Sequence, residues 1–279
     1  MIAKNKAKTG FTVIELSLSM VFISFLLIAV VVLTILMTDI YTKGNTIKNV
    51  TSVGRSLTSD FKKVIGASPA PAGLRQYYRP GESGYSASNP MALRSDRIVF
   101  LVQESKTVSG VKKYQSGRFC TGSYSYLWNT GYQIKQYEES SATAGNVIKY
   151  DGKAVRLLKI SDSGREYCSD AKKSKFDLRS SAGADPDPGG IDLIGSTEAN
   201  LAIYQFSANV TADDSAGGQA LYAISFVLGT MSNTAKGSGD GSIDSAMTCT
   251  PPGGDKSEFN YCAINKFDIV VRATGNKSG

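Results

Sequence analysis

The strongest constraint on the fold is an uninterrupted apolar segment near the start of the chain. Residues Leu16–Thr38 form a run of 23 residues without a charged side chain. As an α-helix this run would be about 35 Å long, which is enough to cross a hydrocarbon core of about 30 Å. We therefore predict a membrane-spanning helix that carries the rest of the chain at its C-terminal end.

Charges at the beginning of this segment predict its orientation. The leader Met1–Gly10 carries Lys4, Lys6 and Lys8 and no acidic residue, so this end should remain cytoplasmic and the larger part of the chain should lie outside. Glu15 lies just inside the apolar segment. Because a carboxylate costs about 2.5–3.5 kcal/mol at the centre of a membrane helix, we interpret Glu15 as a functional residue that needs a positive partner.

The position of a cleavage site can also be predicted. A secretory signal is cut after its apolar run, at small residues. No small-x-small motif lies between Thr34 and Asp39, whereas the small Gly10 is followed by the bulky Phe11. We expect cleavage at this junction and retention of the apolar helix.

The lysine-containing leader, the Gly10-Phe11 junction, Glu15 and the long apolar helix together resemble the class III signal of type IV prepilins and related pilin-like proteins. The resemblance implies that a prepilin peptidase cuts after Gly10 and methylates the new N-terminus at Phe11. It also implies that Glu15, the fifth residue after the cut, pairs with the Phe11 amine of a neighbouring subunit. Many pilins carry Pro or Gly in this helix; residues 11–43 contain neither, so we expect a straighter helix.

The helix should continue beyond the membrane, because apolar residues recur at helical spacing. They are Ile40, Ile47, Val50, Val53, Leu57, Phe61 and Val64. We predict a leader over residues 1–10, a helix over 11–65 and an extracellular β-rich domain over 66–279. Residues 11–38 of the helix would form the transmembrane segment or filament core, and residues 39–65 an amphipathic part that packs on the domain. Gly44 and Gly54 are where we expect it to bend.

After a Pro- and Gly-rich connection over Gly66–Pro90, β-branched and aromatic residues indicate strands. The predicted strands are Arg97–Gln103, Arg118–Tyr126, Tyr132–Tyr137, Ala154–Ile160, Leu201–Val210, Ala220–Leu228 and Phe267–Ala273, with the fifth and sixth forming a hairpin. A helix followed by strands predicts an α+β fold in which the long helix packs on an antiparallel sheet.

Composition excludes several kinds of active site. The chain has no histidine, so a histidine-dependent hydrolase triad or zinc site is excluded. The net charge is +7, and the three leader lysines leave +4 for the mature chain. We interpret the densest basic run, Lys172, Lys173, Lys175 and Arg179, as a solvated loop and not as a nucleic-acid site.

Four cysteines, Cys120, Cys168, Cys249 and Cys262, lie in the part expected outside the membrane. Their spacing does not match a C-x-x-C metal motif, so we expect disulfides. Three pairings are possible. We favour Cys249 with Cys262, which would close a Pro- and Gly-containing loop, and Cys120 with Cys168.

Two weaker patterns in the sequence bear on ligand binding. Asp185, Asp187 and Asp192 faintly resemble a calcium loop, but position twelve from Asp185 is Ser196 and not the Glu of an EF-hand, so solvated turns are the default and no metal site is predicted. The aromatic residues Tyr114, Tyr124, Tyr126, Trp128, Tyr132 and Tyr137 could form an adhesive surface. Packing within the sheet is the simpler interpretation.

The sequence therefore predicts a structural subunit of a type IV pilus or related filament, without enzymatic activity or a cofactor. Its size, and a lower-specificity resemblance around Arg55, Leu57, Asp60 and Ser95–Phe100, favour a larger minor pilin. Expected partners are the prepilin peptidase, other pilin subunits and, before assembly, the cytoplasmic membrane; DNA or a surface ligand has no support in the sequence. The alternatives are a type II secretion pseudopilin and an unprocessed, signal-anchored extracellular binding protein.

Overall fold

The computed structural model describes residues 12–68, 87–88, 101–108, 111–139, 146–169, 172, 174–178, 189–195, 200–214, 219–231 and 262–274. The chain divides into two units, Met1–Asn45 and Thr46–Gly279. The fold class is α+β, as predicted: a long N-terminal apolar helix and antiparallel sheets.

Helix α1 (Val13–Ala67) is 55 residues long and continues through both glycines at which a bend was expected. In the second unit its apolar stripe is buried at Val50, Leu57, Phe61, Val64 and Ile65, which confirms the predicted packing face. The stripe differs from the prediction at its beginning, because Ile40 and Ile47 are 72% and 50% exposed.

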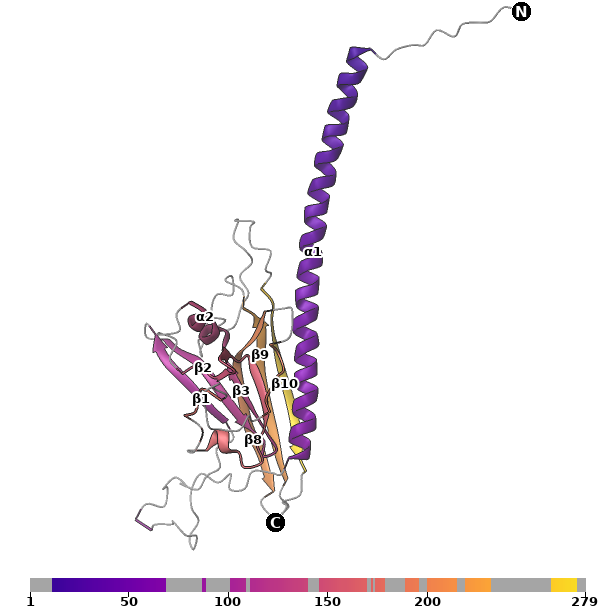
Figure 1. The fold of residues 1–279 in the computed structure, drawn as a ribbon. Helices are drawn as coiled ribbons and strands as arrows, with labels where there is room; N and C mark the ends of the chain where they lie inside the picture. The colour runs from indigo at the N-terminus through magenta and orange to yellow at the C-terminus, as the bar shows by residue number, and fades with distance from the viewer. Residues whose placement is uncertain are drawn as a thin grey trace, which may run out of the picture. The chain divides into compact units, whose positions relative to one another are not determined.

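The strands form three antiparallel sheets (Figure 1). The largest has the order β1-β2-β3-β6-β7, with the bounds Leu101–Val108, Val111–Cys120, Tyr124–Asn129, Leu157–Ser161 and Ile191–Asp192. The second has the order β10-β9-β8, with the bounds Ile264–Ala273, Gln219–Thr230 and Leu201–Asp214. The third pairs β4 (Lys149–Tyr150) with β5 (Lys153–Ala154). A bridge between Thr130 and Ile203 joins the two larger sheets at one point.

The main core lies between α1 and both larger sheets. Phe61 of α1 is fully buried at its centre and meets three aromatic rings edge-on, with centroid distances of 4.8 Å to Tyr126, 5.9 Å to Phe206 and 5.5 Å to Phe226. Because successive residues of a strand point to opposite faces, Tyr126 and Trp128 of β3 face this core while Leu127 faces a second one. The second core lies beneath residues 148–178, including a short 3₁₀ helix η1 (Glu166–Cys168).

Two predicted strands differ from the structure for identifiable reasons. The predicted strand Tyr132–Tyr137 is instead helix α2 (Gly131–Glu139), because Thr130 caps it: the Thr130 hydroxyl accepts a hydrogen bond from Gln133 N at 3.3 Å. The predicted strand Arg118–Tyr126 is broken by a turn at 121–123, where Gly122 takes φ +103°, and becomes the end of β2 and the start of β3.

The predicted strands Leu201–Val210, Ala220–Leu228 and Phe267–Ala273 are confirmed with longer bounds, whereas Ala154–Ile160 is divided between two strands. The predicted hairpin is β8 and β9, and residues 211–214, expected in its loop, continue β8. The predicted strand Ala154–Ile160 corresponds to the end of β5 and most of β6, and Phe267–Ala273 lies within β10. For Arg97–Gln103, only the last three residues are described, and they begin β1; most of the predicted connection Gly66–Pro90 lies outside the described residues.

Candidate functional site

The candidate site is the N-terminal part of α1, where Glu15 lies in the first turn. Thr12 and Glu15 form a reciprocal cap at the start of this helix. The Thr12 backbone N–H and hydroxyl both donate to Glu15 Oε2 at 2.9 Å, and Glu15 N–H donates to Thr12 Oγ1 at 3.4 Å. This is the capping box of the pattern T-x-x-E, which satisfies N–H groups that a helix start otherwise leaves without partners. Glu15 therefore has a local role that the sequence analysis missed, although the T-x-x-E spacing was visible.

The surface that follows Glu15 is apolar and exposed. Large hydrophobic side chains from Val13 to Met37 are 50–86% exposed, and the most apolar part of the helix has none of its residues buried. Within the described residues, α1 is long and apolar enough to cross a membrane, a property that signal sequences share.

The polar side chains in this part of α1 are satisfied within the helix. The hydroxyls of Ser19, Ser24, Thr34 and Thr38 each donate to the carbonyl four residues earlier, at 2.7–2.9 Å. Such bonds leave no hydroxyl in need of water, so the helix surface suits an apolar environment.

The processing residues predicted from the sequence, Gly10 and Phe11, lie outside the described residues. Of the residues predicted for processing and assembly, Glu15 is the one in the described part of the chain, where it forms the cap with Thr12.

A polar cluster joins the second half of α1 to the largest sheet. Asp60 accepts a hydrogen bond from the Tyr126 hydroxyl at 2.7 Å and forms an ion pair with Lys159 at 2.6 Å. The Lys159 ammonium also lies 4.6 Å from the centre of the Tyr124 ring. Burial and the hydrogen bond to Asp60 raise the pKa of Tyr126 well above its ordinary value. This cluster holds α1 at one position along the sheet.

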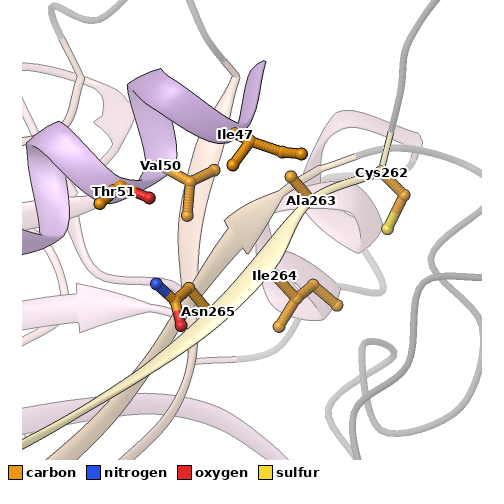
Figure 2. Close-up of a pocket in the computed structure, with 7 residues that line it drawn as sticks. All are labelled: Ile47, Val50, Thr51, Cys262, Ala263, Ile264 and Asn265. Carbon is orange, nitrogen blue, oxygen red and sulfur yellow. The ribbon is translucent and has the colours of Figure 1, made fainter. Parts of the chain in front are cut away.

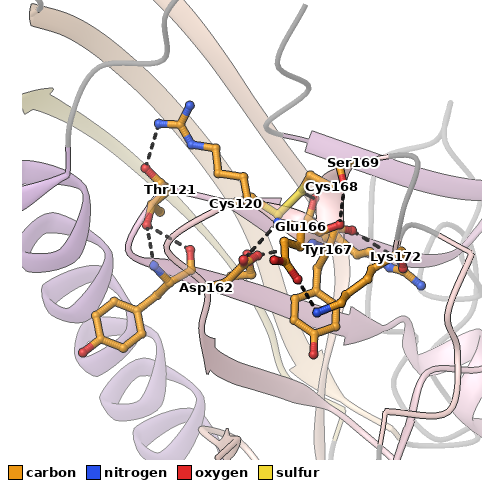
Figure 3. The surroundings of a disulfide bond; sticks show 12 residues. Cys120, Thr121, Asp162, Glu166, Tyr167, Cys168, Ser169 and Lys172 are labelled. Atoms are coloured by element: carbon orange, nitrogen blue, oxygen red, sulfur yellow. Dashed lines mark hydrogen bonds and ion pairs between the residues drawn. A yellow bond between two sulfur atoms is a disulfide. The ribbon is translucent and has the colours of Figure 1, made fainter. Parts of the chain in front are cut away.

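The Cys120–Cys168 disulfide is formed, as predicted, and joins β2 to η1 (Figure 3). Cys262 is also disulfide-bonded, and its predicted partner Cys249 lies outside the described residues. Next to the first disulfide, Glu166 forms an ion pair with Lys172 and accepts a hydrogen bond from Ser169 through its backbone oxygen (Figure 3).

Arg118 is a buried cation beside this disulfide that the sequence analysis did not single out. It is 2% exposed and donates to the backbone oxygens of Lys172 at 2.6 Å, Lys175 at 2.8 Å and Tyr167 at 3.4 Å. Burial lowers its pKa to about 10, so the guanidinium keeps its proton at neutral pH. The basic run expected to be a solvated loop is thus fixed through its backbone at Lys172 and Lys175.

The calcium candidates are not brought together as a site within the described residues. Asp185 and Asp187 lie outside them. Asp192 accepts hydrogen bonds from four backbone N–H groups, those of Arg156, Leu157, Ile194 and Gly195, at 2.9–3.3 Å. Its carboxylate shapes a turn next to β6, and the described residues contain no cluster of three possible metal ligands.

Two of the six aromatic residues proposed for an adhesive surface, Tyr126 and Trp128, lie in the main core. Tyr126 and Trp128 are at most 2% exposed, whereas Tyr124 is 39% exposed. Gly117 lies directly beneath the Trp128 indole, where a Cβ would come within 2.8 Å of three ring atoms. These contacts favour packing, as the sequence analysis concluded.

Together, the apolar α1 and the antiparallel sheets on which it packs form a pilin-like architecture. Comparison with protein-family models, curated proteins and solved structures finds no match to this chain.

Proposed function

We propose that this chain is a structural subunit of a type IV pilus or related filament, most similar in size to a larger minor pilin, and not an enzyme. In this proposal a prepilin peptidase cuts after Gly10, the helix stays in the cytoplasmic membrane, and other pilin subunits then take the place of lipid around it. The mature chain would begin at Phe11.

One observation carries the proposal: a single helix has two halves with opposite surroundings. From Val50 to Ile65 its large apolar residues are buried in the core, apart from the partly buried Val53, whereas from Val13 to Met37 they are exposed. Covering one large apolar side chain contributes about 1.5–3 kcal/mol. A helix surface with this many exposed side chains requires lipid or other apolar helices around it.

Glu15 supports the same proposal because its second carboxylate oxygen, Oε1, can accept a further hydrogen bond. Both bonds from Thr12 go to Oε2, so a neighbouring α-ammonium can approach Oε1 without breaking the cap. A charge-assisted bond of this kind is roughly twice as strong as a neutral one and would be favoured in an apolar filament core.

The test is to determine the N-terminus of the full chain by intact mass and peptide sequencing, in membranes and in sheared filaments. We expect Phe11 as the first residue in both fractions. Glu15→Ala should be processed but absent from sheared filaments, because its charge partner is lost. The control, Thr12→Val, removes the hydroxyl of the cap but keeps the carboxylate and should still assemble.

A second candidate is a signal-anchored extracellular binding protein, and the Thr12–Glu15 cap favours it specifically. The cap gives Glu15 a partner in its own chain, so an acid at this position does not require a filament. This candidate predicts a chain that begins at Met1, remains in the membrane and is unaffected by Glu15→Ala. That combined result would overturn the pilin proposal.

A type II secretion pseudopilin would share the N-terminal features of the first candidate. The subunits that co-purify with the processed chain distinguish these two filament systems. Pilus subunits in the sheared fraction support the proposal, and secretion-machine subunits support the pseudopilin.

A further inference from the structure

Asp60 of α1 and Lys159 of β6 form a close pair that joins two distant parts of the chain. Lys159 Nζ lies 2.6 Å from Asp60 Oδ1, and the lysine and aspartate side chains are 16% and 26% exposed. By contrast, the side chains of the ion pair between Lys266 and Asp268 on β10 are 61% and 64% exposed. The pair between α1 and β6 is therefore much better shielded from water than this surface pair.

Aromatic rings surround the Lys159 ammonium. Its nitrogen lies 4.6 Å from the centre of the Tyr124 ring and 5.8 Å from the centre of the Tyr126 ring. Phe61, the next residue after Asp60 in α1, is fully buried, and its ring centre lies 4.8 Å from that of Tyr126. Charges in such surroundings lose hydration, and this loss can exceed their mutual attraction. A neutral product of the same two groups would avoid that cost.

A third group, the Tyr126 hydroxyl, contacts the same carboxyl group from another direction. It donates to Asp60 Oδ2 at 2.7 Å, whereas Lys159 contacts Oδ1. The Tyr126 side chain is fully buried, so packing holds its hydroxyl in place. A fixed donor of this kind stabilises the negative charge that develops on a carbonyl oxygen during nucleophilic attack. The cluster thus combines an amine, a carboxyl group and a hydrogen-bond donor for the developing charge.

The contact between α1 and the beginning of β10 has a different character (Figure 2). There the helix contributes Ile47, Val50 and Thr51 to the lining of a groove, and residues 262–265 form the other wall. None of these seven residues is a lysine, an aspartate or a glutamate. Their side chains therefore cannot form an amide with one another, whereas those of the Asp60 cluster can.

We propose that Asp60 and Lys159 react to form an isopeptide bond between Cγ of the aspartate and Nζ of the lysine. The ammonium first gives a proton to Oδ1, and the neutral amine then attacks Cγ from about 3–3.5 Å, the separation that favours reaction. Tyr126 stabilises the charge that develops on Oδ2. Oδ1 takes a second proton from the nitrogen and leaves as water. An ammonium and a carboxylate thereby become one amide and one water molecule, without an external reagent.

The bond would fasten the second half of α1 to the largest sheet. Lys159 lies within the segment that the Cys120–Cys168 disulfide encloses, so α1 would be tied to a part of the fold that is itself cross-linked. The inference does not depend on the proposed filament function. All the groups involved lie in the unit Thr46–Gly279, and the bond forms within one chain.

The first experiment is mass spectrometry of the full chain, purified in detergent, reduced and digested with trypsin. Trypsin does not cut after an acylated lysine, so the bond should link peptide Ser56–Lys62 to peptide Leu157–Arg165. The linked mass should be lower than the sum of the two peptides by one water molecule, while cleavage after Lys266, in the exposed pair, stays normal. If the digest instead contains free Leu157–Lys159 and no linked peptide, the inference is overturned.

Two variants test the assigned roles. Lys159→Arg keeps the positive charge but removes the amine, so the linked peptide should be absent; a persisting loss of water from Ser56–Lys62 would overturn the inference. Tyr126→Phe removes only the hydroxyl, and pulse labelling should show the linked peptide forming about 100-fold more slowly. Thermal unfolding in detergent checks that this variant folds. If folded Tyr126→Phe forms the bond at the wild-type rate, the role of the hydroxyl is overturned.

Discussion

Gly54 of α1 lies directly against the ring of Phe267 on β10. A Cβ built on Gly54 would come within 2.5 Å of three carbons of that ring, which is itself stacked on Phe226 with a centroid distance of 5.1 Å. Glycine in a helix interior costs about 1 kcal/mol relative to alanine. The close approach of the helix to the strand compensates for this cost, so Gly54 has a packing role that the sequence did not predict.

Replacing this glycine should destabilise the unit Thr46–Gly279. Leucine is a good helix former, so the loss in Gly54→Leu can come only from overpacking, and we expect the free energy of unfolding to fall by about 1–3 kcal/mol. Gly44→Leu is the control, because a Cβ at Gly44 has nothing within 4 Å. Denaturant unfolding in detergent measures both, and adding Phe267→Ala to Gly54→Leu should recover part of the loss. Equal stability of Gly54→Leu and wild type would contradict the packing role.

We predict that lysine cannot replace Arg118 without a loss of stability. Its planar guanidinium serves three backbone oxygens at once, which a lysine ammonium on a flexible stem cannot reproduce. We expect Arg118→Lys to lower the free energy of unfolding by about 2–3 kcal/mol. The control is Arg156→Lys. Arg156 is partly exposed and also donates to a backbone oxygen, that of Leu201. Its replacement should lower the free energy of unfolding by less than about 1 kcal/mol. A similar loss at both positions would show that burial of Arg118 has no special role.

The Cys120–Cys168 disulfide should stabilise the domain by restricting the unfolded chain. Its cysteines are 48 residues apart and enclose β3, α2 and β4–β6. Replacing both, in Cys120→Ala with Cys168→Ala, should lower the free energy of unfolding by about 2–4 kcal/mol. Thermal unfolding without reductant tests this, since the bond at Cys262 then stays intact in both proteins. If the melting temperature does not change, the packing around the disulfide stabilises the domain without any contribution from the bond itself.

Tyr126 predicts a specific loss of stability in alkali. In the folded protein its pKa is raised by burial and by the bond to Asp60, whereas in the unfolded chain a tyrosine loses its proton near pH 10. The contribution of this group is fully present below pH 10 and declines as the pH rises above that value, by up to about 1.4 kcal/mol per pH unit. Tyr126→Phe cannot ionise, so its free energy of unfolding should fall less steeply between pH 10 and 11 than that of wild type. Parallel pH profiles would contradict the assignment.

The sequence pattern was enough to predict those elements whose determining residues lie close together in the chain. The apolar run from Leu16 to Thr38 predicts a helix because a segment that crosses a membrane must satisfy its own backbone hydrogen bonds, and the stripe from Val50 to Val64 predicts one because its spacing repeats every turn; α1 has both. The hairpin of β8 and β9 follows in the same way from two β-rich runs separated by a Gly-containing loop. The sequence left all three pairings of the four cysteines possible and favoured the one that contains Cys120–Cys168, which the structure has.

Elements that depend on distant residues could be seen only in the tertiary structure. Residues Tyr132–Tyr137 have strand-like composition, yet they form helix α2, whose first residue, Gly131, packs closely on the distant Tyr204. Arg118 finds its partners 49–57 residues later in the chain, and Asp60 finds Lys159 99 residues later. Ile47 and Val50 share one helical stripe, but Val50 is 1% exposed and belongs to the main core, whereas Ile47 is 50% exposed. A periodic pattern determines which face of a helix is apolar. How far along the helix that face is covered depends on where the rest of the chain packs against it in the tertiary structure.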